Sequence, residues 1–425
     1  MLDRIEAPDI RRLNQLKINR PGYCVLSNGI PVYQFTNDSY KAMRLDLIFN
    51  AGSAFQKKML EAGTTNIMLK ESNLKWSSQR LSAKLDYHGS YIDLSIDKDN
   101  AWLTLFCLRK NFNYLLPLIR SMVTTPRFSP SDFLLVNSKQ KNIFAINDQK
   151  PRHIARKLFN KKIFGENTPY GQIAELTDFD QLSVDDLKQF HHQHYHFGNC
   201  RMIVSGPVND KHLARLEDTF GDEWGYHDNI KSFDQHTDFT PGIFRSKLIN
   251  SLQSAIFMGK PLVNREHPDF PKLLVLNTVF GGYFGSRLMS NIREDKGYTY
   301  GIYSQIAAFR KAAIMQIITE VGAEVTKATL DEIYKEINRL RHEVISTEEL
   351  SLVKNYLYGQ FLRSLDGPYA LAERLKTIID LDEGMDYYER SYRGIQDVEA
   401  EELLEMARTY LDPEAMLTVV VGRDE

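Results

Sequence analysis

One segment is more informative about the architecture than any other: Val279-Phe280-Gly281-Gly282-Tyr283-Phe284-Gly285-Ser286-Arg287-Leu288-Met289-Ser290-Asn291-Ile292-Arg293-Glu294-Asp295-Lys296-Gly297-Tyr298-Thr299-Tyr300-Gly301. Three glycines near its start permit a sharp turn and a close backbone approach between two helical pieces. Gly297 then ends the second piece and releases an extended segment that carries Tyr298 and Tyr300. Arg293 precedes Tyr300 by seven residues. Taken alone, this pattern favours Arg293 in a surface ion pair and Tyr300 in a core.

The segments around this run indicate that the chain repeats one plan twice. Ser129-Pro130-Ser131-Asp132-Phe133 leads a helix to Phe144, and Ser346-Thr347-Glu348-Glu349-Leu350 leads another to Phe361, 217 residues later. A strand ends at Gly206, and a similar one ends at Gly422, 216 residues later. Two matches at almost the same offset favour a tandem duplication.

Each half mixes strands with helices. Asn28-Gly29 is typical of a hairpin turn, and alternating apolar residues predict strands over 43–49, 92–96 and 101–105, with a further strand over 201–206. Ser77 or Ser78 can cap a helix that Gly89 ends, and further helices are expected over 111–122, 131–147, 152–163 and 183–194. We therefore expect an α+β fold of two tandem duplicated domains, residues 1–224 and 242–425. Residues 225–241 are polar and aperiodic, as in a linker.

The composition excludes several classes of protein. The chain has 425 residues, 43% of them hydrophobic and 25% charged, which argues against disorder and coiled coils. With 53 basic and 55 acidic residues it is nearly neutral, so nucleic acid is not an expected partner. No run of about 18 apolar residues predicts a membrane span, and Met1–Pro8 lacks a signal-peptide core. Three distant cysteines, expected in strands, fit a cytoplasmic protein, or a periplasmic one if this is a processed form.

Two clusters of charge or imidazole remain open to more than one interpretation. His191-His192-Gln193-His194-Tyr195-His196 has metal-binding residue types, but a helix end favours histidines for their charge alone. His342-Glu343 begins like H-E-x-x-H, yet Ser346 stands where the second histidine is needed. The basic residues between Lys139 and Lys162 favour a solvated helix face over a positive wall for a partner or an acidic ligand.

The Gly281–Gly301 run, with Gln253-Ser254 before it and Thr418–Gly422 at the end, resembles the insulinase (pitrilysin) family of zinc metallopeptidases. That family includes the mitochondrial processing peptidases and the core proteins of a respiratory complex. The resemblance covers nearly the whole chain, including Ala51-Gly52-Ser53 and Tyr195 with Asn199. It implies a clam-shaped pair of duplicated domains, in agreement with the repeat.

Catalytic members of this family carry an inverted zinc motif, H-x-x-E-H, on a helix of the first domain. The matching window here, Leu60–Asn73, contains no histidine, and the best register places Gly63, Asn66 and Ile67 at the three catalytic positions. Residues 140–148, where a later glutamate would complete the zinc site, contain no glutamate. We therefore expect no metal or other cofactor in this chain, and no peptide hydrolysis by the chain alone.

The resemblance also implies what the second domain does. In the family, an arginine and a tyrosine reach the zinc site and hold the substrate backbone and the oxyanion; Arg293 and Tyr300 match them, and Tyr298 is a weaker rival. The leading hypothesis is a non-catalytic subunit that binds extended peptides in a heterodimer with a zinc-bearing family member. The alternatives are a structural or peptide-binding member without a peptidase partner and, least favoured, a peptidase with atypical zinc ligands.

Overall fold

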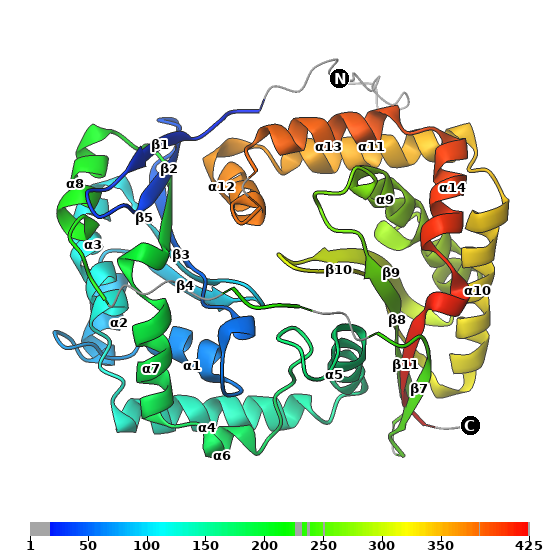
Figure 1. Ribbon diagram of the computed structural model, residues 1–425, viewed down its shortest axis with the longest axis horizontal. Helices are drawn as coiled ribbons and strands as arrows, with labels where there is room; N and C mark the ends of the chain where they lie inside the picture. Colours follow the sequence, from blue (N-terminus) through cyan, green and yellow to red (C-terminus); the bar gives the residue numbers. More distant parts are fainter. Residues whose placement is uncertain (1–17, 226–231, 236–238, 250, 382, 424–425) are drawn as a thin grey trace, which may run out of the picture.

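The computed structural model describes residues 18–225, 232–235, 239–249, 251–381 and 383–423. We call the part up to residue 225 the N-terminal half and the part from residue 242 the C-terminal half. Each half contains one mixed sheet packed against helices (Figure 1), which confirms the α+β fold class.

The N-terminal half alternates strands and helices. Its strands are β1 (Gly22–Val25), β2 (Pro31–Thr36), β3 (Ala42–Phe49), β4 (Tyr91–Ile96), β5 (Ala101–Leu108) and β6 (Cys200–Gly206). Its helices are α1 (Glu61–Met68), α2 (Ser78–Tyr87), α3 (Arg109–Thr124), α4 (Pro130–Asn147), α5 (Pro151–Phe164), α6 (Asp178–Gln181), α7 (Val184–His194) and α8 (Asp210–Phe220), with 3-10 turns η1 (Ser53–Phe55) and η2 (Phe197–Asn199).

The C-terminal half follows the same order. Its strands are β7 (Gly242–Lys247), β8 (Gln253–Leu262), β9 (Thr299–Ala308), β10 (Ala313–Gly322) and β11 (Leu417–Gly422). Its helices are α9 (Phe270–Asn277), α10 (Thr326–His342), α11 (Thr347–Arg363), α12 (Gly367–Ile378), α13 (Asp386–Asp397) and α14 (Ala400–Tyr410), with π-helical turns η3 (Thr278–Gly282) and η4 (Met289–Asp295) and 3-10 turns η5 (Ala323–Val325) and η6 (Pro413–Ala415).

The strand order confirms the duplication. The N-terminal sheet runs β1-β2-β6-β3-β5-β4, and the C-terminal sheet runs β7-β11-β8-β10-β9. If β7 is matched with β2 and β11 with β6, all five shared positions agree, and in both sheets this outer pair is the parallel one. The strand β1, paired antiparallel with β2, is the one that has no counterpart among the described residues.

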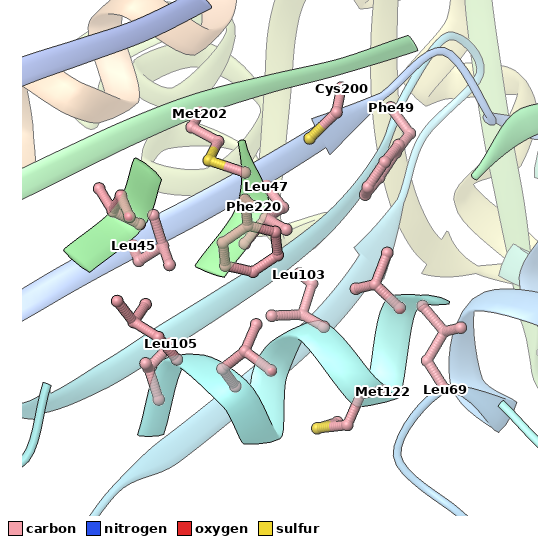
Figure 2. Packing of buried hydrophobic residues seen from close by; sticks show 14 of the residues in the cluster. Leu45, Leu47, Phe49, Leu69, Leu103, Leu105, Met122, Cys200, Met202 and Phe220 are labelled. Carbon is pink, nitrogen blue, oxygen red and sulfur yellow. The ribbon is translucent and has the colours of Figure 1, made fainter. Parts of the chain in front are cut away.

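The core of the N-terminal half follows from the alternation of apolar residues along its strands. Leu45, Leu47 and Phe49 of β3 point to one face, where they meet Leu103 and Leu105 of β5 (Figure 2). Helices α3 and α8 cover this face, and Met122 and Phe220 are fully buried there. Cys24, Cys107 and Cys200 lie in strands as predicted, and all three are free thiols.

One helix of each half packs against the sheet of the other half (Figure 1). Helix α5 packs on β8 and β11, where Phe159 contacts Phe257 with ring centroids 5.8 Å apart. Helix α12 packs on β2 and β6, where Leu375 and Ile378 share a cluster with Ile203. The two halves therefore share two hydrophobic clusters in addition to their own cores.

Most predicted elements lie within a few residues of their expected bounds, although two details differ or stay open. Ser77 precedes α2, but its side chain makes no capping bond, and Ser78 instead donates to Glu71 at 2.9 Å. The proposed linker 225–241 falls partly outside the described residues, so the domain bounds remain a prediction; its described Phe233 packs against Phe55 and Tyr170. Among the described helices, none has the length and apolar composition of a membrane span.

Candidate functional site

The side chain of Arg293 lies at the end of η4 and is held from two sides. Its Nε donates a hydrogen bond to the backbone carbonyl of Tyr300 at 3.1 Å. Its guanidinium carbon lies 4.5 Å from the centre of the Phe284 ring, a cation–π contact. The closest carboxylate contact, to Glu294, is 3.9 Å long. Arg293 therefore has the surface ion pair that the pattern alone favours, but this pair is long, and a carbonyl and a ring orient the guanidinium.

The side chain of Tyr300 is presented to solvent by an irregularity in the sheet. Between the pairs Val321↔Thr299 and Thr319↔Ile302, two residues of β9 oppose one residue of β10, which makes a β-bulge. The hydroxyl of Thr299 donates to the carbonyl of Glu320 at 2.8 Å, and that of Thr319 donates to the carbonyl of Gly301 at 3.0 Å. The bulge is thus hydrogen-bonded, and Tyr300 on it is 95% exposed, so the core position that the pattern alone favours is wrong.

The neighbouring Tyr298 has a different environment. Its side chain is half-buried and packs against the core of the C-terminal half, and its backbone N–H donates to the carbonyl of Ile292 at 3.0 Å. The structure therefore separates the two tyrosines, one in the packing of the fold and one available to a ligand. This arrangement favours Tyr300 over Tyr298 for the role that the resemblance implies.

Two glycines of the same run are required by the backbone. A Cβ at Gly281 would lie 2.7 Å from the backbone nitrogen of Ser304, so only glycine lets η3 approach β9 this closely. Gly297 has a φ of +68°, in the left-handed region, where it ends η4 and starts the extended segment. These two glycines therefore allow the chain to pass from the π-helical turns to strand β9 within a few residues.

The three positions that match the zinc motif lie on α1 and do not form a metal-ligand set. A Cβ at Gly63 would lie 3.5 Å from the Ile96 side chain of β4, and Ile67 packs in a small hydrophobic cluster. Asn66 is buried: its amide donates to the carbonyl of Ser95 at 3.0 Å, and its carbonyl accepts from the hydroxyl of Tyr195 at 3.2 Å. Asn66, at one of the motif positions, thus forms hydrogen bonds that join α1 to β4 and to the segment after α7, and it binds no metal in this arrangement.

Zinc does not fit this window. Structural and catalytic zinc sites need imidazole, thiolate or carboxylate donors, and the three positions supply none. The nearby carboxylate of Glu61 accepts instead from the backbone N–H of Lys57 at 2.9 Å. Within the described part of the chain, no group of three His, Cys, Asp or Glu side chains is arranged to hold a metal ion.

The histidine cluster at the end of α7 is built into the packing. A ring nitrogen of His191 donates to the carbonyl of Val123 at 2.7 Å, and one of His194 donates to the carbonyl of Asn50 at 3.0 Å. Burial lowers the pKa of each of these two histidines to about 4, so both are neutral at pH 7. These contacts support the structural interpretation of this segment.

Half of the basic residues between Lys139 and Lys162 form ion pairs with acidic side chains. Five ion pairs among the described residues cover this stretch: Lys141–Asp180, Lys157–Asp148, Lys157–Glu175, Lys161–Glu166 and Arg152–Glu320. This pairing supports a solvated, charge-balanced face over a positive wall.

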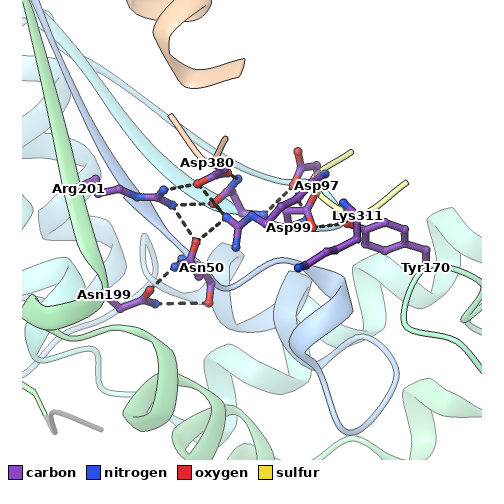
Figure 3. Close-up of polar contacts among 10 residues, drawn as sticks. Asn50, Asp97, Asp99, Tyr170, Asn199, Arg201, Lys311 and Asp380 are labelled. Atoms are coloured by element: carbon purple, nitrogen blue, oxygen red, sulfur yellow. Dashed lines mark hydrogen bonds and ion pairs between the residues drawn. The ribbon is translucent and has the colours of Figure 1, made fainter. Parts of the chain in front are cut away.

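A polar cluster between the halves was not predicted. Asp380, after α12, forms ion pairs with Arg201 of β6 and with Arg310 at the tip of the β9–β10 hairpin (Figure 3). Arg310 also donates to Asn50 at 2.7 Å, and its backbone N–H donates to Asp99 at 2.9 Å. Although burial opposes the charged form, the two arginines hold the pKa of Asp380 below its usual value. The cluster fastens the hairpin to the N-terminal half.

Beside this cluster lies a cavity of about 530 Å³ between the halves, lined by both sheets and by α12. Its N-terminal wall is the face of β4 and β5 that carries Asp93, Trp102 and Phe106. Within the described residues, no hydrogen bond or ion pair joins α1 to Arg293 or Tyr300. The structure thus places the degenerate motif on α1 of one half and the arginine–tyrosine pair in the other half.

Comparison with known proteins shows which family the chain resembles. Residues 181–357 match the model described as "Peptidase M16 inactive domain". The "Uncharacterized zinc protease YmxG" of Bacillus subtilis is 22% identical over 80% of this chain and 83% of its own length. The match over residues 181–357, and the relative along most of the chain, show that this chain is similar to the M16 peptidase family. This result confirms the family resemblance found in the sequence.

Other M16 relatives differ in what their names say about activity. The "Non-peptidase homolog YmxG" of Helicobacter pylori is 21% identical over 77% of this chain and 82% of its own. The crystal structure of a peptidase M16 inactive domain from Pseudomonas fluorescens superposes with a TM-score of 0.88 and 21% identity, covering 96% of this chain and 98% of that one. The likeness to that structure extends the fold assignment to nearly the whole chain.

Proposed function

We propose that this chain is a non-catalytic subunit that contributes Arg293 and Tyr300 to the active site of a zinc-bearing M16 partner. The single observation that carries the proposal is the presentation of these two side chains: Tyr300 is 95% exposed on a bulge, and Arg293 is oriented beside it. A tyrosine this exposed adds little packing to its own chain, whereas its ring and hydroxyl are available to a ligand or a partner.

The chemistry of the pair suits an oxyanion. A guanidinium and a phenol both donate hydrogen bonds, and preorganised donors stabilise the negative oxygen that develops during peptide hydrolysis. In this chain the two donors have no zinc ligands near them, because Gly63, Asn66 and Ile67 occupy the motif positions in the other half. The reacting centre must then come from a partner that carries H-x-x-E-H.

An extended peptide would have an edge on which to align. Strand β4 is the outer strand of the N-terminal sheet and borders the cavity between the halves. The other outer strand near the cavity, β9, is more covered, because its Ser304 and Ala308 carbonyls accept hydrogen bonds from Asn277 and Arg265. On β4 one carbonyl, that of Ser95, accepts a side-chain hydrogen bond, from Asn66. Strand addition at β4 is therefore the favoured mode of peptide binding.

Reconstitution tests this function. The chain is mixed with an M16 protein that carries H-x-x-E-H and is encoded beside it, and hydrolysis of a quenched fluorescent peptide is followed. We expect activity from the mixture that neither protein shows alone, and none when the motif glutamate of the partner is replaced by glutamine. A partner that is fully active alone and gains nothing on mixing would favour the alternative, a structural or peptide-binding member.

A further inference from the structure

The outer edge of the C-terminal sheet lacks a strand that the N-terminal sheet has. In the N-terminal half, β1 pairs antiparallel with β2 over Gly22↔Gln34 to Val25↔Pro31. The counterpart position beside β7 is open: within the described residues, β7 pairs with β11 and with no other strand. The duplication therefore leaves a place for one strand at the β7 edge.

The backbone of β7 is ready to pair on that side. The N–H of Gly242 donates to Met416 at 3.0 Å, and the N–H of Leu248 donates to Gly422 at 2.7 Å, both on the β11 side. Because N–H groups alternate in direction along a strand, the amides and carbonyls of Ile243 and Arg245 point to the open edge. An incoming strand would find pairing positions at both residues.

The side chains at this edge define the chemistry of an occupant. Ile243 is exposed on β7, and Ile249 and Leu252 are exposed in the turn that follows it. Arg245 is exposed and forms no ion pair with a described residue. On the opposite face of the strand, the ammonium group of Lys162 lies 3.6 Å from the centre of the Phe244 ring. The edge thus combines apolar side chains with unmatched positive charge.

These charges disfavour a second copy of this chain as the occupant. Two β7 strands paired antiparallel with the two-fold axis at Arg245 would place Arg245 opposite Arg245, and like charges in directly opposed positions destabilise a sheet. Cationic side chains on an edge strand are a known protection against self-pairing. The same charges attract a strand that carries acidic residues opposite them.

We propose that the β7 edge is a docking site for an extended, acidic segment of another protein, which adds as an antiparallel strand in the place that β1 holds in the other half. A carboxylate of the segment would lie opposite Arg245, and an apolar residue two positions along it would lie opposite Ile243. This proposal goes beyond the peptidase role and does not depend on it, because β7 is in the outer part of the sheet and Tyr300 is on β9 at the opposite edge.

A labelled peptide tests this docking site directly. The probe is acetyl-Glu-Thr-Glu-Thr-Val-Thr-Val-amide with a fluorophore, in which a glutamate and the valine two positions later can lie opposite Arg245 and Ile243. Its anisotropy is titrated with the full chain at low salt. We expect saturable binding that weakens at least tenfold when alternate peptide nitrogens are methylated, because methylation removes backbone pairing. Hydrogen exchange at Ile243 and Arg245 should slow in the complex.

Two variants and one control locate the site. Arg245→Glu should weaken binding of the acidic probe at least tenfold and create binding of the same peptide with lysines in place of its glutamates. Arg245→Pro removes one edge N–H but no bond to β11, and should also weaken binding. Arg80→Glu makes the same charge change on exposed α2 and should leave binding unchanged. Absence of binding, binding unaffected by methylation, or a dimer of the chain that Arg245→Pro dissociates would overturn the proposal.

Discussion

Arg293 and Tyr300 are linked through the side chain of one and the backbone of the other: Nε of Arg293 donates to the carbonyl oxygen of Tyr300 at 3.1 Å. This bond uses one of the five guanidinium N–H groups and leaves the phenol hydroxyl uninvolved. Within the described residues, no hydrogen bond engages the Tyr300 hydroxyl, which is on a side chain that is 95% exposed. Both side chains are thus oriented while their remaining donors stay available.

Metal analysis of the purified chain tests the assignment of the degenerate motif. We expect no stoichiometric zinc, because Gly63, Asn66 and Ile67 offer no ligand and Asn66 is engaged with Ser95 and Tyr195. The measurement is inductively coupled plasma mass spectrometry after dialysis against zinc and then against buffer. One tightly bound zinc per chain that disappears when residues 60–73 are mutated would contradict this expectation.

Replacement of Asp380 by asparagine should destabilise the fold strongly at pH 7. The carboxylate is 10% exposed and pairs with both Arg201 and Arg310, so its removal leaves two mostly buried cations without their partner. The expected loss is about 3 kcal/mol of unfolding free energy, measured by denaturant titration. The control Asp38→Asn, an exposed residue 3.7 Å from Arg109, should cost less than about 1 kcal/mol.

The same pair of variants makes a prediction about pH. Because the folded-state pKa of Asp380 is below its unfolded value of 3.8, its contribution is present above that pH and is lost as the pH falls through the folded pKa. The stability difference between the wild type and Asp380→Asn should therefore be constant from pH 7 to about pH 5 and shrink below about pH 4. A difference that grows on acidification would contradict the ion-pair account.

Limited proteolysis tests the domain bounds that the sequence predicts. The first cut is expected within residues 225–241 and should give two fragments of similar size. Because α5 and α12 each pack on the sheet of the opposite half, the nicked fragments should stay together in gel filtration and separate only in denaturant. Early cutting within residues 81–106, or fragments that separate without denaturant, would argue against this organisation.

The fold class and the duplication could be predicted from the sequence, because the patterns that indicate them are either local or repeated in both halves. The offsets from Phe144 to Phe361 and from Gly206 to Gly422 report the duplication, and alternation along 43–49 reports a strand with one buried face. The packing of α5 and α12 on the sheet of the opposite half could not be predicted, because the pattern of an amphipathic helix shows which face is buried but not which sheet covers it.

The candidate site was predictable only in part. The pattern around Arg293 and Tyr300 is specific to a family, but a single sequence does not show which tyrosine is exposed; that depends on the bulge opposite Glu320. The cluster around Asp380 was not predicted, because Asp380 and Arg201 are 179 residues apart in the sequence and belong to different halves. Nothing in the local pattern of an isolated aspartate distinguishes a long-range ion pair from a solvated charge.

The proposed role of the arginine–tyrosine pair is decided by the activity of the reconstituted complex with Tyr300→Phe and Arg293→Ala. Removal of one oxyanion donor should cost roughly 3–4 kcal/mol of transition-state stabilisation, about a hundred- to thousandfold loss of rate, with little change in subunit affinity or melting temperature. Tyr303→Phe, another exposed tyrosine on β9, is the matched control and should keep full activity. If Tyr300→Phe and Arg293→Ala both retain full activity in a complex whose zinc-bearing partner needs this chain, the two residues are not part of the active site.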